Sequence, residues 1–482
     1  MQHWARTLLV SSLVLIGAQA MANGMVLPDE QLQQDLSWLS NRGVINISLS
    51  TWPMSGEEIQ LALSDARPQT TQDQLMLEQV RDRVTALKAR FIVAGQTASD
   101  FNPLGQGLGD TTTDQHQLSA IGQYQNQHVD VRLQGNAVGG DGVDRSSHGN
   151  VNGSYGAVKV GNQWLSFGQQ QRWWGPGKEG SLIMGHTARP VTGFSLQRAE
   201  QTPFETPWLS WLGRWQYQVV AGQLAHYDAV PDAKLIGMRV NIQPTEYLEL
   251  GASRAMQWGG DGRPQSGKSL WNAFIGKGDN TYTAEQKSNE PGNQLGGFDA
   301  KLKLQPLTGW PVSVYAQAVG EDESGGLPSK NTYLLGVEGS HVLGNNALNW
   351  YIEGADTTTE LGRDEGYTYN HHIYKDGYYQ DGAPLGHTLG GDAQTLSTKI
   401  VVATPDQQRF SGKVTYAEVN PTDHRNNRIL SSADKMAMLE VGYGKTFKNG
   451  LNVDSTVWYN YAADVPTYDG AGVGVKVSMP FK

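Results

Sequence analysis

Apolar and polar side chains alternate with a period of two over most of the chain beyond Phe91. Near residue 130, Val129, Val131 and Leu133 alternate with polar neighbours, and the same pattern recurs at 472–481. One apolar and one polar face per strand is typical of a barrel with lipid outside and a wet lumen. The pattern predicts an all-β transmembrane barrel of about 18 antiparallel strands. The predicted strands are centred near residues 95, 120, 132, 155, 167, 195, 220, 238, 251, 301, 316, 337, 352, 397, 412, 440, 456 and 475.

The connections between the predicted strands alternate in length. The short connections lie at 161–162, 244–245, 307–310, 344–345, 405–406 and 448–450. The long connections lie at 101–116, 139–150, 171–190, 258–295, 321–331, 358–391 and 419–433. Tight periplasmic turns and long extracellular loops alternate in this way in outer-membrane barrels, so both termini are expected in the periplasm. The connection at 200–213 is too long for its place in this scheme. A soluble β-sandwich array or propeller is the alternative fold, but neither requires the alternation.

The segment before the strands has helical periodicity. Asp29 is suited to cap a first helix, which Gly43 ends, and Thr71 opens a third helix. Ser55 and Glu58 have the spacing of a capping box at the start of a second helix. The apolar faces of the three helices carry Leu32, Leu36, Leu39, Ile59, Leu63, Leu77, Val80, Val84 and Leu87. Because so small a bundle has little core of its own, we expect it to pack against the barrel.

The first residues have the layout of a secretory signal peptide. Arg6 precedes an apolar run at 7–16, and small residues follow in Ala18-Gln19-Ala20. The run is shorter than the roughly 20 apolar residues of a membrane-spanning helix, which favours cleavage after residue 20 or 22. The expected domains are a signal peptide at 1–20, a periplasmic helical bundle or plug at 23–92, and an outer-membrane β-barrel with long extracellular loops at 93–482.

Composition excludes several classes of protein. The 482 residues include 37 Lys and Arg against 47 Asp and Glu, a net charge of −10, so nucleic acid is not an expected partner. The absence of Cys excludes disulfides, thiolate zinc sites and cysteine nucleophiles. The sequence motifs of serine hydrolases and zinc proteases are missing. We therefore predict no catalysis, no cofactor and no metal. A glycosidase stays open as an alternative, because the separation of two carboxylates is a property of the fold.

Two short clusters are compatible with metal binding but favour ordinary loop roles. His371 and His372 would point to opposite faces of an extended chain and lack a nearby third ligand in the sequence, so we expect two solvated histidines. The run Glu321-Asp322-Glu323 lies at a strand end, where a charged loop tip is more common than a calcium site.

The long connections are rich in aromatic side chains that alternate with charged ones. Flat aromatic faces stack on sugar rings, and Lys and Arg pair with acidic groups on sugars. An interfacial aromatic girdle, or packing within the loops, is the alternative role for these side chains. The candidate carbohydrate-binding residues are Trp173, Trp174, Lys178, Trp258, Arg263, Trp271, His371, His372, Tyr374, Lys375, Tyr378 and Tyr379.

Several long runs resemble one family of outer-membrane proteins. They include 35–40, 48–53, 163–169, 173–177, 257–266, 290–295 and 371–379, the last reading His-His-Ile-Tyr-Lys-Asp-Gly-Tyr-Tyr. Runs of this length and composition closely resemble the capsule-assembly protein Wzi family. The resemblance extends along essentially the whole chain. It implies an eighteen-stranded barrel, a periplasmic helical bundle against its lower end and a lectin-like role without catalysis.

The residues and the resemblance together predict an outer-membrane lectin that binds capsular polysaccharide and helps to attach it to the cell surface. A porin or sugar-diffusion channel is the alternative, and a glycan hydrolase is the third possibility. The expected partners are capsular polysaccharide, outer-membrane lipid and the capsule export machinery.

Overall fold

The computed structural model describes residues 24–85, 89–100, 102, 104, 107–108, 114–142, 148–275, 290, 292–324, 327–362, 366–421, 426–431, 435–463 and 468–481. The expected signal peptide, at 1–20, lies outside these residues, as does Leu87 of the third predicted helix.

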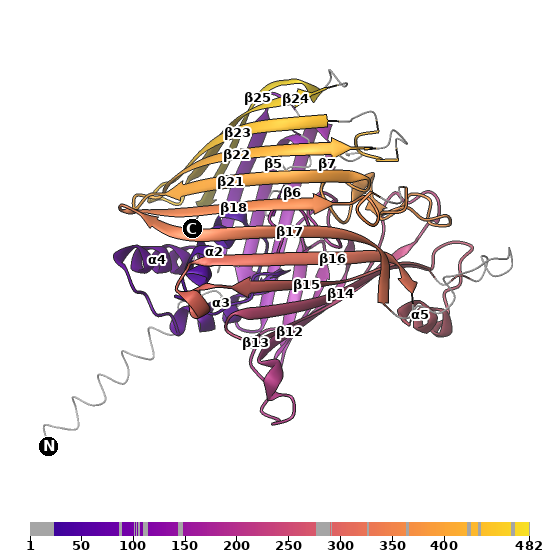
Figure 1. Cartoon of the computed structure of the whole chain (residues 1–482), viewed down its shortest axis with the longest axis horizontal. Coiled ribbons are helices and arrows are strands. Elements are labelled where there is room, and N and C mark those ends of the chain that lie inside the picture. The colour runs from indigo at the N-terminus through magenta and orange to yellow at the C-terminus, as the bar shows by residue number, and fades with distance from the viewer. Residues whose placement is uncertain are drawn as a thin grey trace, which may run out of the picture.

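In the described part of the chain, eighteen long strands close into one antiparallel barrel (Figure 1). They are β4 (Ala89–Ala98), β5 (Asp114–Gln125), β6 (Val129–Gly142), β8 (Tyr155–Val160), β9 (Gln163–Gly168), β11 (Thr192–Arg198), β12 (Arg214–Gln223), β13 (Lys234–Thr245), β14 (Leu248–Trp258), β15 (Gly292–Lys303), β16 (Val312–Ser324), β17 (Leu327–Leu343), β18 (Asn346–Asp356), β21 (Ala393–Ala403), β22 (Gln408–Val419), β23 (Lys435–Thr446), β24 (Asn452–Ala462) and β25 (Gly470–Phe481). The short strand β7 (Gly149–Asn150) pairs with β6 beside β8. The last strand, β25, pairs with the first, β4, which closes the ring. Each predicted strand centre lies within one of these strands, so the predicted barrel is confirmed.

The two faces of the barrel wall differ as the alternation predicts. Leu133, Phe298 and Leu335 project outward and are exposed, whereas Gln317 and Glu338 project inward and are buried. An apolar outer face matches the lipid-facing wall of a transmembrane barrel. Within the described residues, no helix is long and apolar enough to cross a membrane.

One predicted connection differs in the structure, and the connection that is too long for the alternating scheme is confirmed as long. Most of the expected connection at 321–331 is strand, because β16 and β17 extend toward each other as far as Ser324 and Leu327. The connection between β11 and β12 is long, as the sequence indicates, although the strands on either side are predicted correctly. It contains a 3-10 turn, η1 (Ser210–Leu212), and exposes Trp208 and Trp211.

The three predicted helices are confirmed as α2 (Glu30–Asn41), α3 (Gly56–Ser64) and α4 (Thr71–Thr85). Asp29 caps α2, since its side chain accepts the backbone N–H of Leu32 at 2.7 Å. The predicted capping box of α3 is wrong. Ser55 is the N-cap residue but makes no capping hydrogen bond with its side chain, and the Glu58 carboxylate accepts the backbone N–H of Gln201 at 2.7 Å. Glu58 also pairs with Arg214 of β12.

The helices lie at one end of the barrel, which we call the helical end (Figure 1). Helix α2 packs against β17 and β18. Its last residue, Asn41, accepts the hydroxyl hydrogen of Ser313 at 2.7 Å and donates to Ser340 at 3.2 Å. Arg409 of β22 pairs with Asp35 at 2.5 Å, also within α2. We call the opposite end, toward which the long connections extend, the loop end.

Candidate functional site

The chain between β9 and β11 folds back inside the barrel. This stretch, residues 169–191, is called the lumenal segment below. It carries β10 (Trp173–Trp174), which pairs with β2 (Thr51–Trp52) of the N-terminal region and places Trp173 opposite Trp52. The backbone N–H of Gly175 also donates to the carbonyl of Ser50 at 2.8 Å. The N-terminal region and the lumenal segment therefore meet inside the barrel.

A buried carboxylate on the barrel wall holds the lumenal segment. Glu353 of β18 accepts the backbone N–H groups of Lys178, Glu179 and Gly180 at 2.7, 3.0 and 3.3 Å. It also accepts the Tyr315 hydroxyl hydrogen at 2.8 Å. Glu353 therefore holds this turn to the barrel wall through its backbone N–H groups.

Lys178, Trp173 and Trp174, three of the predicted binding residues, are buried within this arrangement. The Lys178 ammonium forms an ion pair with Glu338 of β17 at 2.9 Å. The Trp174 indole N–H donates to Gln218 at 2.6 Å. The structure thus gives these three side chains packing and pairing partners inside the barrel, and their contact with sugar stays a prediction.

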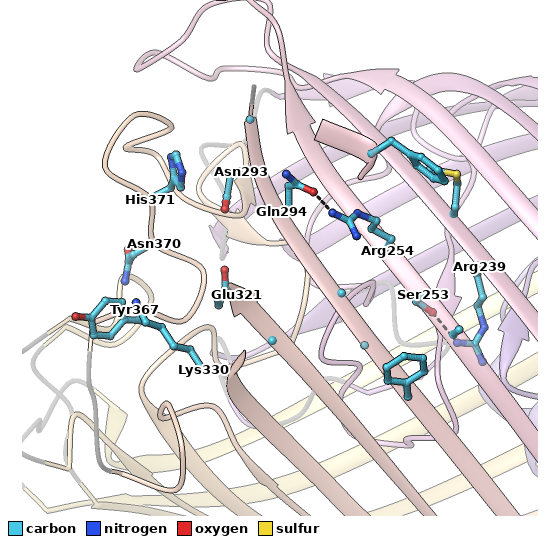
Figure 2. Close-up of a pocket in the computed structure, with 18 of the residues that line it drawn as sticks. Arg239, Ser253, Arg254, Asn293, Gln294, Glu321, Lys330, Tyr367, Asn370 and His371 are labelled. Carbon is cyan, nitrogen blue, oxygen red and sulfur yellow. Dashed lines mark hydrogen bonds between the residues drawn. The ribbon is translucent and has the colours of Figure 1, made fainter. Parts of the chain in front are cut away.

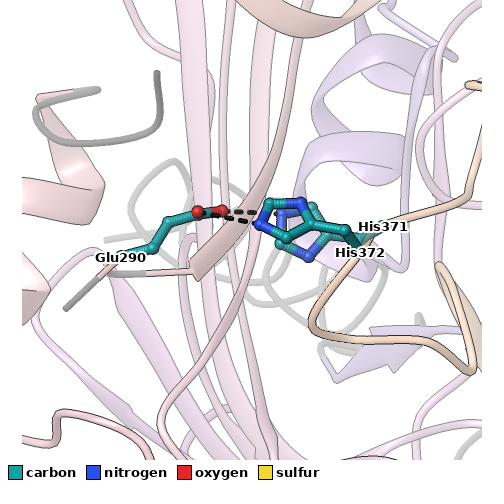
Figure 3. A group of neighbouring side chains, drawn as sticks. All are labelled: Glu290, His371 and His372. Atoms are coloured by element: carbon teal, nitrogen blue, oxygen red, sulfur yellow. Dashed lines mark ion pairs between the residues drawn. The ribbon is translucent and has the colours of Figure 1, made fainter. Parts of the chain in front are cut away.

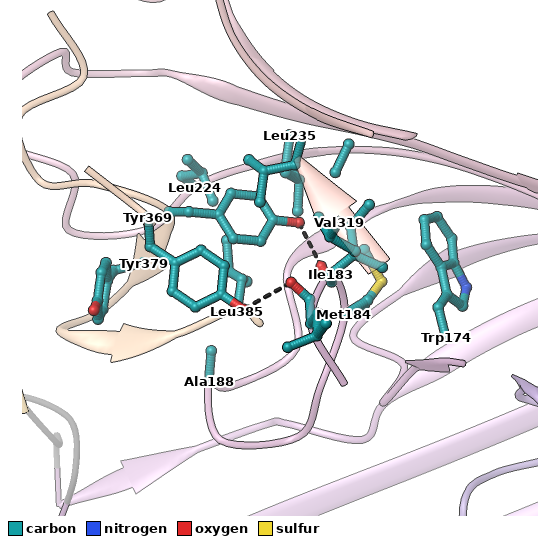
Figure 4. Packing of buried hydrophobic residues seen from close by; sticks show 14 of the residues in the cluster. Trp174, Ile183, Met184, Ala188, Leu224, Leu235, Val319, Tyr369, Tyr379 and Leu385 are labelled. Atoms are coloured by element: carbon teal, nitrogen blue, oxygen red, sulfur yellow. Dashed lines mark hydrogen bonds between the residues drawn. The ribbon is translucent and has the colours of Figure 1, made fainter. Parts of the chain in front are cut away.

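The loop between β18 and β21, residues 357–392, covers the lumenal segment; we call it the tyrosine-rich loop. Figure 4 shows its rings packed on the lumenal segment. The hydroxyls of Tyr369 and Tyr378 donate to the carbonyls of Leu182 and Ile183 at 2.7 and 2.8 Å. Tyr374 donates in the same way to Gly259 at 3.1 Å. The tyrosines therefore join separate connections into one packed layer.

Some of the predicted binding residues in the tyrosine-rich loop are buried and others are exposed. Tyr374, Tyr378 and Tyr379 are buried, and burial raises the pKa of Tyr374 and of Tyr379 to about 12. Lys375 is exposed. His372 is half exposed, since 47% of its side chain is accessible.

The expectation that His371 and His372 diverge without a third ligand is wrong. Both rings face the buried carboxylate of Glu290, whose two oxygens lie 3.0 and 3.1 Å from the Nε2 atoms (Figure 3). The ring centroids are 4.5 Å apart. Glu290 comes from the connection before β15, so the pattern around the histidines could not reveal it. The three ligand atoms lie within 4.8 Å of one another, close enough to hold a metal ion.

The hydrogen bonds of His371 favour direct pairing over metal ligation. Its Nδ1 accepts the backbone N–H groups of Ile373 and Tyr374, both at 3.2 Å. In a neutral imidazole this places the ring proton on Nε2, facing Glu290. A metal-bound histidine instead donates its other ring N–H to an acceptor. The cluster therefore joins the tyrosine-rich loop to the connection before β15.

Beside this cluster lies a pocket of ≈ 710 Å³ that extends from the loop end to the outward-facing Val240 and Phe298 (Figure 2). Arg254 donates to Gln294, and the Lys330 ammonium lies 3.8 Å from the centroid of the Tyr367 ring. Amide, cationic and aromatic side chains of this kind are suited to the hydroxyls and ring faces of a sugar. The polar and aromatic residues that line this pocket include Arg254, Asn293, Gln294, Glu321, Lys330, Tyr367, Asn370, His371 and His372.

The sequence prediction identified only part of this lining. His371 and His372 were among the predicted residues. Asn293 and Gln294 lie in the run 290–295 that carries the family resemblance, whereas Arg254 and Lys330 have no local signal. Glu321 belongs to the expected acidic loop tip, and its carboxylate accepts the backbone N–H of Tyr369 at 2.7 Å. The side chains of Asp322 and Glu323, the other two residues of this tip, are outside the described part of the structure.

The remaining three predicted residues surround the connection after β14. Trp258 donates to Ser269 at 3.2 Å, and Arg263 donates to the backbone carbonyl of Glu290 at 2.6 Å. Trp271 lies on α5 (Gly267–Phe274), a helix that packs on β14 and β15, and is exposed. Arg263 thus supports the Glu290 cluster, while Trp271 is accessible to a ligand or to lipid.

One buried histidine makes the packing of the tyrosine-rich loop sensitive to pH. Burial lowers the pKa of His387 to about 4, below the value of about 6.5 in an unfolded chain. The released loop therefore binds more protons, and the packed loop loses about 1.4 kcal/mol per pH unit as the pH falls from about 6.5 toward 4. Thermal unfolding followed by tryptophan fluorescence should show this loss, and His387→Gln should flatten it. An unfolding temperature independent of pH in this window would contradict the assignment.

A closed barrel of eighteen antiparallel strands with an apolar outer face defines an outer-membrane β-barrel protein. The family model for the capsule assembly protein Wzi matches residues 92–469. The chain belongs to the Wzi capsule assembly family.

Two relatives match nearly the whole chain. An uncharacterized 55.8 kDa protein in the cps region of Klebsiella pneumoniae is 50% identical over 466 residues, which are 97% of this chain and 91% of the relative. A solved structure is described as Wzi, an outer membrane protein involved in group 1 capsule assembly in Escherichia coli and a carbohydrate-binding β-barrel. It is 46% identical, with a TM-score of 0.87 over 95% of this chain and 100% of its own.

Proposed function

We propose that the protein binds capsular polysaccharide at the loop end of the barrel and helps to attach and organise the capsule on the cell surface. The observation that carries the proposal is the 46% identity, over nearly the full length of both chains, to a barrel described as carbohydrate-binding and involved in capsule assembly. Many weak contacts along a repeating polymer would give avidity without one tight pocket.

The loop end offers the polymer a cationic surface. Arg428 is exposed beside Lys375, and its guanidinium donates to the backbone carbonyl of Lys375 at 2.5 Å and to Asn370 at 3.0 Å. Guanidinium groups pair strongly with carboxylates, so this surface suits an acidic polymer. In the proposed arrangement, the buried tyrosines hold the loops in place and the exposed cations make contact.

The proposed topology follows from this role. The signal peptide at 1–20 is removed on export, both termini and the helical end face the periplasm, and the loop end faces outward. Outer-membrane lipid surrounds the barrel. The helical end is the surface available to the capsule export machinery.

A diffusion channel is the weaker candidate, because the lumenal segment and the N-terminal region pair inside the barrel. Catalysis is not part of the proposal. Incubation of purified protein with capsular polysaccharide should release no new reducing ends, and abundant release would contradict a binding role.

Deletion of the gene should leave polymer synthesis intact while moving capsule from the cells into the medium. The reason is that a retention protein acts after export. Polysaccharide in the cell pellet and in the medium would be measured separately, with the complemented strain as control. Loss of polymer from both fractions would indicate a role in export instead.

A further inference from the structure

A second, larger cavity lies inside the barrel, between the N-terminal region and the wall formed by β24, β25, β4, β5 and β6. Its volume is ≈ 1290 Å³. Ligand pockets for small molecules usually measure roughly 300–1,000 Å³, so this cavity has room for more than a single sugar ring. The exposed turn residues Lys448 and Asn449 line it, which shows that it opens at the helical end.

The wall of the cavity is a ladder of hydrogen-bonded polar side chains. Gln117 donates to Ser119 at 2.8 Å, and Ser119 donates to Asn136 at 2.7 Å. Gln134 donates to the same Asn136 oxygen at 2.9 Å. These contacts fix the orientation of the amides before any ligand arrives, which lowers the entropic cost of binding one.

Two arginines lie in one row across this wall. The strand register places Arg90 of β4 opposite Gln123 of β5, and Gln123 opposite Arg132 of β6. Neighbouring strands are about 4.8 Å apart, so the backbones of the two arginines are separated by only about 10 Å. All three side chains line the cavity.

Neither arginine forms a direct ion pair among the described residues, although Asp29 and Asp130 act on Arg90 and Arg132 at longer range. Arg132 donates to the amide oxygens of Gln134 at 2.9 Å and of Gln123 at 3.1 Å. Within the same part of the chain, the Arg90 Nε is buried without a hydrogen-bond partner. In contrast, Arg189 at the edge of the same cavity is paired with Asp114 at 3.2 Å. Seven Lys and Arg residues line the cavity against four Asp residues, so the lining as a whole carries an excess of positive charge.

We propose that this cavity binds an acidic saccharide, with its carboxylate between Arg90 and Arg132 and its hydroxyls on the amide ladder. Arginine binds carboxylates with paired N–H groups, and amides both donate to and accept from hydroxyls. The inference extends the proposed polysaccharide binding to a second site. That the ligand is a sugar rests on the proposed function. It adds a site at the helical end to the contacts proposed at the loop end.

The test is calorimetric titration of the purified full-length protein in detergent with glucuronate, glucose and sulfate. We expect glucuronate to bind, glucose to bind at least tenfold more weakly, and the double variant Arg90→Gln/Arg132→Gln to lose at least tenfold in glucuronate affinity. Arg81→Gln is the matched control, because Arg81 donates to the Leu63 carbonyl and does not line the cavity. Heat-modifiable migration of each variant reports whether the barrel has folded.

Two results would overturn the inference. Equal binding of sulfate and glucuronate would indicate an adventitious ion only, and unchanged glucuronate affinity in a folded double variant would place the ligand elsewhere. Capture of whole capsular polymer by the wild type is measured in parallel. Polymer capture without glucuronate binding would refute the cavity site alone, whereas absence of polymer capture would refute the proposed function.

Discussion

Replacement of Glu353 by Ala is expected to release the lumenal segment and raise the conductance of the barrel several-fold. Four donors lose their shared acceptor: the backbone N–H groups of Lys178, Glu179 and Gly180, and the Tyr315 hydroxyl. Each buried donor left without a partner costs about 1–3 kcal/mol, which a turn can avoid by leaving its site. Single-channel recording in planar bilayers measures the change.

Ser397→Ala is the matched control for Glu353→Ala. Ser397 also faces the lumen, but its hydroxyl contacts Thr415 at 3.1 Å and not the lumenal segment. Its conductance should equal that of the wild type. If Glu353→Ala conducts no better than Ser397→Ala, the lumenal segment is held by its tryptophans and ion pairs, and the carboxylate is dispensable.

Tyr378→Ala should abolish most of the capture of capsular polymer, whereas Tyr378→Phe should retain most of it. Removal of the buried ring leaves a cavity, a change that costs about 3–5 kcal/mol for an aromatic residue. Phe keeps the ring and loses only the hydrogen bond to the Ile183 carbonyl at 2.8 Å, worth about 1 kcal/mol. Pull-down of labelled polysaccharide measures capture, and heat-modifiable migration checks the barrel.

The control for this pair is Tyr461→Ala, because Tyr461 is exposed on the outer wall of β24. It should capture polymer as the wild type does. If Tyr378→Ala also captures polymer normally, the packing of the tyrosine-rich loop does not position the binding surface.

The barrel itself was predictable because each strand repeats the same local rule. Each strand faces lipid on one side and polar groups on the other, so its apolar and polar residues alternate with a period of two. Because the barrel is closed, every strand follows this pattern. The same reasoning failed at 321–331, where Gly, Ser and acidic residues indicate a loop although β16 and β17 continue their pairing there. Turn-forming residues show where two strands are connected, but they do not show how many residues on each side of the turn stay paired.

The candidate site was less predictable because its contacts join distant segments. The spacing of Ser55 and Glu58 fits a capping box, but Arg214 of β12 and the backbone of Gln201 bind the Glu58 carboxylate instead. Likewise, Glu290 approaches the histidine pair from another connection. Aromatic residues in a loop are visible in the sequence. Whether they face a ligand or one another is decided by tertiary packing, as at Tyr378.

The helices and the first barrel strand are close along the chain, and this keeps the helices near the barrel. Helix α4 ends at Thr85 and β4 begins at Ala89, so only residues 86–88 separate them. A tether this short keeps the helices at an effective concentration of about millimolar or higher. Helices that detach are therefore recaptured at once, and dilution cannot remove them. The same helices supplied as a separate peptide would need at least about millimolar concentrations to compete.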